Sequence, residues 1–174
     1  MLIFNNLGVS AIKLGESIES VSPISPFGLQ DREMLIPDPN PESWFKYNGD
    51  VSSLSNKENK VISARSIYLS QNPKKKINRI VIHPDLSKTN ELIEDFLSSI
   101  YGTPMTTTGG YSKLGGVTNY NIFYYTPEDK SSQIIYFKTF SSDFGIDEIS
   151  FRFLTDEDAL LNYKLVYRSW AHLK

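Results

Sequence analysis

The sequence predicts an α+β protein in which an antiparallel sheet is covered by helices. Runs of β-branched residues alternate with polar residues through the second half of the chain, which is typical of strands. Twice, such runs are followed by a segment whose apolar residues recur at spacings of three and four, which is typical of a helix with one buried face. This order indicates a pseudo-repeat of strands followed by a helix, and helices packed on such a sheet would bury its apolar face.

The first unit of the pseudo-repeat begins at residue 61. Residues 61–69 and 77–83 are β-branched runs joined by a polar turn, which predicts a β-hairpin. A helix is expected over 87–101, with Ser87 as its N-cap and with Gly102 ending it. The apolar face of this helix holds Leu92, Ile93, Phe96, Leu97 and Ile100.

The second unit contains three strands and a helix. Residues 118–126 and 132–140 are expected to pair antiparallel, because the connection between them is too short for a crossover. The strand over 148–153 alternates apolar with polar residues, which predicts one dry face and one face in water. A final helix is expected over 155–171, with Thr155 as its N-cap. The polar face of the 148–153 strand holds Glu148, Ser150 and Arg152.

The first 60 residues differ from the rest of the chain. Residues 10–14 are typical of a strand, and they lead through Gly15 into an expected short helix over 16–21. Residues 22–60 are expected to form a long irregular loop, because they are rich in proline. A loop of this length is usually functional. We therefore expect residues 1–174 to form a single domain, with an N-terminal segment over 1–60 and a strand–helix core over 61–174. The prolines of the loop are Pro23, Pro26, Pro37, Pro39 and Pro41.

Composition excludes several classes of function. The chain has 174 residues, a net charge of -2 and no cysteine, which excludes disulfide scaffolds, cysteine-ligated zinc and iron–sulfur sites, and thiol nucleophiles. No apolar run approaches the roughly 18 residues of a membrane helix. The N-terminus lacks the basic region of a signal peptide, so the expected compartment is the cytoplasm.

No residue pattern predicts catalysis, a cofactor or a metal site. The two histidines, His83 and His172, lack a nearby nucleophile motif, and a hydrolase built around His83 and nearby carboxylates ranks third among the functions considered. The glycine pairs over 109–116 lack the Gly-Lys-Ser/Thr ending of a phosphate loop, which favours a mobile connection between strands. Asp143, Asp147 and Glu148 lack the regular alternation of a calcium loop.

Charge is unevenly distributed along the chain. Residues 1–50 contain three basic and seven acidic side chains, whereas residues 51–88 contain eight basic and two acidic ones. The basic residues include the turn Lys74–Lys76 with nearby Arg79. Binding of nucleic acid needs a broader basic face, so a solubilising turn that guards a sheet edge is favoured over a nucleic-acid partner.

Residues 38–50 combine aromatic and acidic side chains within the proline-rich loop. Such a combination is enriched at protein interfaces, which predicts a partner-binding site here. In the alternative, Trp44 and Phe45 pin the loop onto the sheet. Trp44→Ala separates the two, because it costs about 2 kcal/mol of binding in the first case and about 3–5 kcal/mol of folding stability in the second. The candidate anchors are Trp44, Phe45 and Tyr47, and the candidate charged rim is Glu42 and Asp50.

Two short segments resemble small bacterial modules. Residues 12–21, Ile-Lys-Leu-Gly-Glu-Ser-Ile-Glu-Ser-Val, are similar to the strand–Gly–short-helix opening of BamE and beta-lactamase-inhibitor-like modules. Residues 97–104 resemble the helix-ending Tyr-Gly-x-Pro of the same modules. The chain departs from the lipoprotein members in having neither a signal nor an acylated cysteine. This resemblance implies the alternative function, a non-catalytic envelope-associated or substrate-binding module.

The overall profile resembles a second group, the immunity proteins of bacterial contact-dependent or polymorphic toxin systems. The chain shares with them a size near 20 kDa, the absence of cysteine and of active-site motifs, and the expected α+β architecture. This resemblance implies the leading function, a non-enzymatic inhibitor that binds a cognate toxin, such as a basic nuclease, and occludes its active site. Acidic surface would then steer association with a basic partner.

Overall fold

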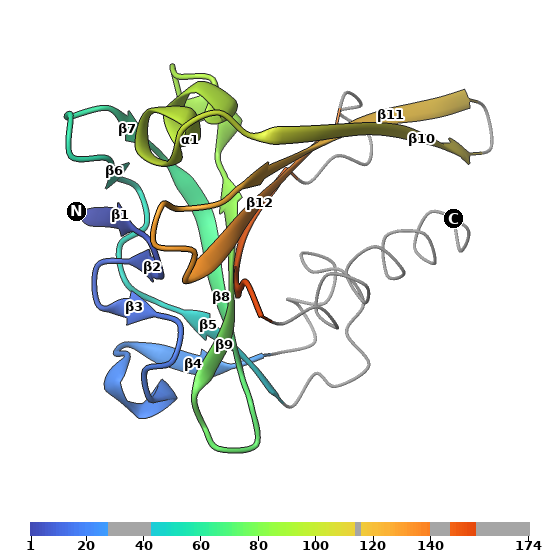
Figure 1. Ribbon diagram of the computed structural model, residues 1–174. Helices are drawn as coiled ribbons and strands as arrows, with labels where there is room; N and C mark the ends of the chain where they lie inside the picture. Colours follow the sequence, from blue (N-terminus) through green and yellow to red (C-terminus); the bar gives the residue numbers. More distant parts are fainter. Residues whose placement is uncertain (28–42, 114–115, 140–146, 156–174) are drawn as a thin grey trace.

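The computed structural model describes residues 1–27, 43–113, 116–139 and 147–155 (Figure 1). Strands dominate this part of the chain, which holds one α-helix, α1 (Ile93–Tyr101), and two sheets of eight and five strands. The predicted α+β class, with its pseudo-repeat and covering helices, is therefore wrong. The N-terminal residues form a second sheet. This sheet and α1 together cover one face of the large sheet, where the prediction placed helices alone. The helix expected over 155–171 lies almost wholly outside the described residues.

The eight-stranded sheet is antiparallel throughout. The hairpin predicted over 61–69 and 77–83 is confirmed as β8 and β9, except that residues 61–62 form β7 of the small sheet. The antiparallel pairing predicted for 118–126 and 132–140 is confirmed as β11 and β12. Pairing of β13 with β9 joins the two halves, although these strands lie far apart in the sequence. The strand order is β10 (Met105–Lys113), β11 (Gly116–Tyr125), β12 (Ser132–Thr139), β13 (Glu148–Phe153), β9 (Ile77–Pro84), β8 (Ala64–Gln71), β5 (Trp44–Tyr47) and β4 (Ile24–Pro26).

The five-stranded sheet is small and is built from the two ends of the N-terminal segment. Only β1 and β6 pair in parallel, and the other neighbours are antiparallel. The strand expected over 10–14 is reduced to β3, and the helix expected over 16–21 is reduced to the 3-10 turn η1 (Ile18–Ser20). The strand order is β3 (Ile12–Lys13), β2 (Gly8–Val9), β1 (Leu2–Asn5), β6 (Leu54–Ser55) and β7 (Val61–Ile62).

The prediction of an irregular loop over 22–60 is wrong where its described residues form β4, β5 and β6, and it holds for most of the other described residues. β4 and β5 add to the large sheet beside β8, and β6 pairs with β1 in the small sheet. Proline is compatible with β4 because this strand lies at a sheet edge, where one side of the backbone needs no partner. Backbone pairing with distant strands therefore orders residues whose local composition is typical of a loop.

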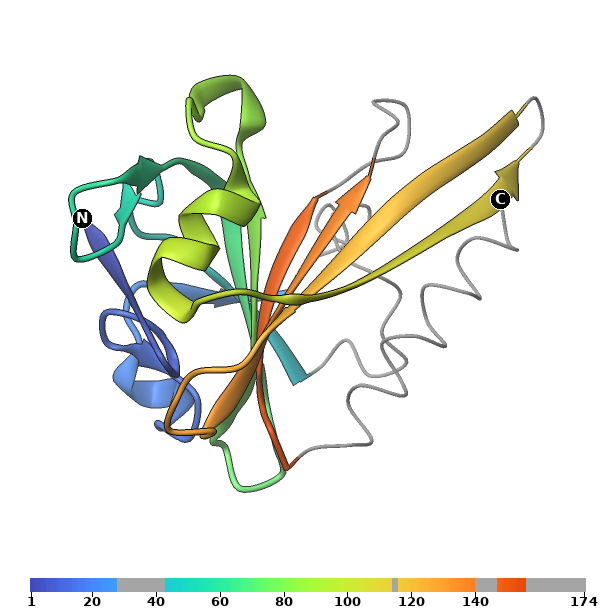
Figure 2. The ribbon, with the colours of Figure 1, turned by 45° about the horizontal axis from the view of Figure 1, so that its top comes forward.

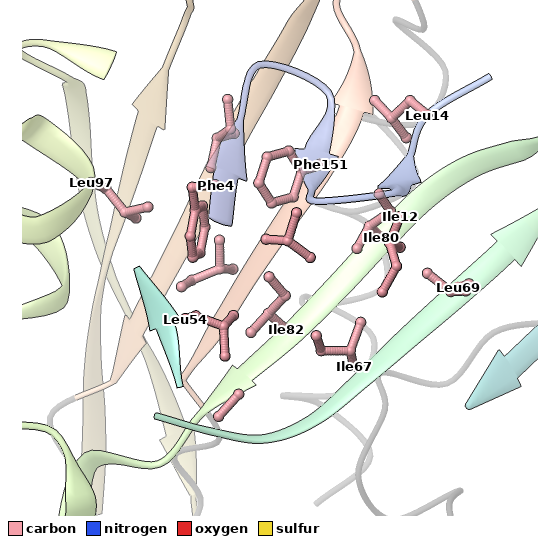
Figure 3. Packing of buried hydrophobic residues seen from close by; sticks show 14 of the residues in the cluster. Phe4, Ile12, Leu14, Leu54, Ile67, Leu69, Ile80, Ile82, Leu97 and Phe151 are labelled. Atoms are coloured by element: carbon pink, nitrogen blue, oxygen red, sulfur yellow. The ribbon is translucent and has the colours of Figure 1, made fainter. Parts of the chain in front are cut away.

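The main core lies between one face of the large sheet and a layer made of the small sheet and α1 (Figure 2). Figure 3 shows side chains from both layers meeting there. The ring of Phe4, in β1, packs edge-on against Phe96 of α1, with 5.2 Å between ring centroids, and lies 5.9 Å from the ring of Phe151 in β13. The first strand and the last described strand thus share one core.

Helix α1 is shorter than predicted at its N-terminus. Residues 86–88 form a separate 3-10 turn, η4 (Leu86–Lys88), whose N-cap is Asp85 rather than the predicted helix N-cap Ser87. The Asp85 carboxylate accepts hydrogen bonds from the backbone N–H and the side chain of Ser87, so this segment folds as a local turn before the helix begins. The predicted end of the helix at Gly102 is confirmed, with φ of 85°.

At Gly8, in β2 of the small sheet, any side chain would collide with neighbouring backbone. A Cβ atom added at Gly8 would lie 2.0 Å from the carbonyl oxygen of Ile12 and 2.8 Å from Cδ1 of Ile80. We expect Gly8→Ala to lower the free energy of unfolding by about 1–3 kcal/mol, the usual cost of overpacking. Urea denaturation measures it, with Lys57→Ala, at an exposed position, as the control. Equal costs for the two variants would contradict this close approach.

Candidate functional site

The structure separates the residues predicted to bind a partner. Trp44 is buried, with 4% of its surface exposed, and packs with Tyr68 and Val81 on the face of the large sheet opposite the main core. Phe45 and Tyr47 lie on the other face and are half-buried against the main core. Of the two alternatives for Trp44 and Phe45, their burial favours pinning of the segment to the sheet.

The two predicted rim charges are not brought together with these aromatics. Asp50 is exposed and accepts hydrogen bonds from the side chain and the backbone N–H of Ser52, which hold the pKa of its carboxyl below the ordinary value. Glu42 lies outside the described residues. Partner binding by this segment stays a prediction, and its described aromatics are placed by the sheet rather than by an exposed loop.

The face of the large sheet that bears Trp44 also carries a row of buried polar residues. We call it the polar strip, and it crosses the centre of the sheet from β8 to β12. The prediction that the polar side of the 148–153 strand faces water is wrong, because Glu148, Ser150 and Arg152 are all buried. Strand alternation correctly placed these residues on one face, but it contained no information about what covers that face. The polar strip consists of half-buried Arg79 and the buried residues Ser66, His83, Gln133, Glu148 and Arg152.

Hydrogen bonds and ion pairs connect the polar strip across the strands. Ser66 Oγ lies 3.2 Å from His83 Nδ1, and His83 Nε2 lies 3.4 Å from Glu148 Oε2. The other carboxylate oxygen of Glu148, Oε1, lies 3.7 Å from Nη2 of Arg79, and Arg152 donates a hydrogen bond to Gln133. A neutral His83 ring that donates Nε2–H to Glu148 can accept the Ser66 hydroxyl proton at Nδ1.

The order Ser66–His83–Glu148 has the residue types of a nucleophile, a base and an orienting acid. His83 is fully buried, and only 4% of Ser66 is exposed. A nucleophile must reach its substrate, and the Ser66 hydroxyl is enclosed in this conformation. The arrangement links β8, β9 and β13 through side-chain contacts across one face of the sheet. Sequence reasoning singled out His83 but missed Ser66 and Glu148 as its neighbours, because only the pairing of distant strands brings the three together.

Asp147, which precedes β13, is a buried carboxylate on the side of the main core. Its oxygens accept hydrogen bonds from the hydroxyl of Tyr136, at 2.6 Å, and from the backbone N–H of Thr139, at 3.1 Å. Burial raises the pKa of Asp147 above the ordinary value, and these hydrogen bonds oppose the rise only in part. The same burial, with the nearby Asp147 charge, raises the pKa of Tyr136, which keeps this hydroxyl protonated as the donor.

The raised pKa of Asp147 predicts whether the stability of the protein rises or falls with pH. The folded protein binds the Asp147 proton more tightly than the unfolded chain, so this group favours folding at low pH and opposes it at high pH. The stability of the wild type relative to Asp147→Asn is therefore expected to fall as pH rises from 3.8, the ordinary value, through the raised pKa. Urea denaturation of both proteins at several pH values measures it. Asp50→Asn is the control and should show no such fall, since the pKa of Asp50 is lowered. A difference that does not change with pH would contradict the assignment.

Two surface pockets lack an arrangement of side chains that indicates catalysis or a particular ligand. One, of about 470 Å³, lies between the small sheet and α1, and its polar groups largely bond to one another. Asn6 donates to Asp129 there, and Ser99 accepts a hydrogen bond from Asn56. The other, also of about 470 Å³, is lined by residues around η4 together with Asp147. No cluster of three or more histidine or carboxylate side chains suited to hold a metal ion occurs in the described ranges.

As far as the structure describes the chain, β10 forms one edge of the large sheet. Among the described residues, β10 pairs with β11 alone, over nine residues from Met105 to Lys113. Met105 is 73% exposed, and Thr106, Thr107 and Thr108 are exposed as well. Sequence analysis assigned 109–116 to a mobile connection because of its glycines and missed this strand. The run of three threonines, which are β-branched, was the signal for it.

The β10–β11 hairpin extends as an arm beyond α1 and the small sheet (Figures 1 and 2). Hydrogen-bonded and non-hydrogen-bonded pairs alternate along an antiparallel ladder, so every second residue of β10 directs its N–H and C=O groups away from β11. Residues 105–112 contain no proline and no charged residue, the features that usually block such an edge. The β10 edge is therefore suited to pair with another strand.

Within the described part of the chain, no helix has the length and apolar character that crossing a bilayer requires. The chain was compared with models of protein families, with curated proteins and with solved structures, and none of these comparisons found a match.

Proposed function

We propose that this chain is a protein-binding inhibitor that neutralises a cognate bacterial toxin. The observation that supports it is the β10 edge, a nine-residue strand on a projecting arm that pairs on one side only within the described part of the chain. Addition of a partner strand to an exposed edge is a recurrent mode of protein recognition, in which main-chain hydrogen bonds provide affinity. An inhibitor that holds a strand of a toxin in this way blocks any active site built on or beside that strand.

This proposal moves the partner contact from residues 38–50 to β10. β5, which carries Trp44, lies near the opposite edge of the large sheet, and its aromatic side chains are used in packing. The exposed threonines of β10 fit the role better, because short polar side chains leave the backbone groups of the edge accessible to a second strand. Acidic residues elsewhere, such as exposed Asp50, then act on the rate of encounter with a basic toxin rather than on the bound complex.

The test is genetic and uses the reading frames that flank the gene. Each is expressed in a bacterial host, alone and together with this chain, and growth is followed. We expect one product that stops growth alone and is tolerated when this chain is present. If no flanking product is both toxic and neutralised, the inhibitor function is wrong.

Proline substitutions locate the contact on β10. Thr107 and Thr108 are neighbours, so one of their two N–H groups points away from β11 and the other towards it. Proline at the outward position should abolish protection from the toxin and leave the melting temperature unchanged. Proline at the inward position should lower the melting temperature, because it removes a bond to β11. Protection that persists in both variants would exclude β10 as the site.

A further inference from the structure

We propose that β10 also pairs with β10 of a second copy of this chain, antiparallel about a twofold axis, so that one sheet runs through a homodimer. This inference shares the β10 edge with the proposed function and is otherwise independent of it. Self-pairing would regulate partner binding, because the β10 edge cannot pair with a second copy and with a partner strand at the same time. The dimer then protects an edge that would otherwise be a site of aggregation until the partner arrives.

The two edges of the large sheet differ in length and in proline content, and this difference limits the proposed assembly to two copies. The opposite edge is β4, which has three residues, ends at Pro26 and follows Pro23. Proline cannot donate to a ladder, so this edge accepts no long strand. With one usable edge on the large sheet as far as it is described, each copy can add only one neighbour there. Pairing of like edges is isologous and closes at a dimer, whereas two usable edges would give an open chain of copies.

The β10 sequence is compatible with pairing to itself. A twofold axis at Gly109 aligns the full length of the two strands and places Thr108 opposite Gly110 and Met105 opposite Lys113. No two like charges are opposed, since Lys113 is the only charged residue in the strand. The axis also falls at a position without a side chain, which allows close approach of the two backbones.

The arm places this edge where a second copy can reach it. β10 and β11 extend past α1 and the small sheet, so those two elements do not obstruct the pairing of two arms (Figure 2). The cross-strand partner of Gly109 within the copy is Tyr120, whose ring stacks on Phe137 with 5.1 Å between centroids. Contacts behind β10 thus hold this part of the arm in one conformation before it pairs, which lowers the entropy lost on association.

The experiment uses light scattering coupled to size exclusion, from low micromolar to several hundred micromolar protein. The wild type is expected to double its mass with concentration. Thr108 is exposed, and in the proposed register the two copies of residue 108 are diagonal neighbours within reach of long side chains. Thr108→Lys and Thr108→Glu should therefore each weaken the dimer at least tenfold. An equimolar mixture of the two variants should restore it as a heterodimer.

The outcomes separate this inference from the proposed function. A wild type that stays monomeric throughout the range would overturn self-pairing and leave the toxin test unaffected. A dimer that both charged variants keep at wild-type strength would overturn pairing through β10. Rescue in the mixture supports the pairing even if no flanking gene encodes a toxin. The control is Ser25→Glu on β4, opposite Lys46, which should leave the mass unchanged because that edge is not used.

Discussion

Trp44→Ala is expected to lower the free energy of unfolding by about 3–5 kcal/mol, as large aromatic truncations in cores do. Trp44 is 4% exposed and packs with Tyr68 and Val81, and the guanidinium of Arg79 lies 5.6 Å from the centre of its ring. Truncation would leave a cavity and would also remove the ring face beside Arg79. Urea denaturation followed by far-ultraviolet circular dichroism measures the loss without depending on the fluorescence of the residue removed.

Two variants make this measurement specific. Trp44→Phe keeps an aromatic ring in place and should lose clearly less stability than Trp44→Ala. Asp50→Lys, an exposed position just after β5, should change stability little. If Trp44→Ala is as stable as the wild type, the side chain is not part of the folded core, and its role as an exposed anchor for a partner would return.

Glu148→Ala is expected to have the second large effect, about 1–3 kcal/mol, because it leaves the buried Nε2 of His83 without its hydrogen-bond partner and removes the charge beside half-buried Arg79. The carboxylate of Glu148 contacts both His83 and Arg79, and its side chain is 3% exposed. Glu148→Gln keeps the shape and some hydrogen bonding, so it should cost less than the alanine variant. Chemical denaturation of the three proteins at neutral pH provides the comparison.

An exposed ion pair in the same molecule is the control. Lys75 and Glu19 lie 3.9 Å apart, with side chains 70% and 76% exposed, so Lys75→Ala should cost only about 0–1 kcal/mol. Equal losses for Glu148→Ala and Lys75→Ala would show that the polar strip adds little to stability. A hydrolytic activity that is lost in a stably folded His83→Ala would instead assign the strip a catalytic role.

Local signals were sufficient for the parts of the fold that depend on near neighbours. The hairpin of β8 and β9 and the pairing of β11 with β12 followed from β-branched runs separated by short polar turns. The end of α1 followed from Gly102, which adopts the positive φ that glycine tolerates. In each case the residues that determine the structure lie within a few positions of one another.

Assignments that depend on distant residues were wrong or missing. The region 22–60 has the composition of a loop, yet its described residues include strands because β8 and β1 offer backbone groups to pair with. The two glycines of β10 favour a connection between strands, although all nine of its residues pair with β11. Local propensity reflects how easily a segment adopts a strand or a loop by itself. It contains no information about a distant strand whose backbone hydrogen bonds stabilise the segment.

The sequence by itself determined which residues share a face of the strands that it predicted, where the turns between those strands fall and where the helix ends. Only the tertiary structure decided that the polar face of β13 is buried, that Ser66, His83 and Glu148 meet, and that β10 is left at an edge. The physical reason is that alternation along a strand separates two faces without specifying what covers either one. Burial, partners and free edges come from strand order, and here that order is set by pairings, such as β13 with β9, between segments far apart in the chain.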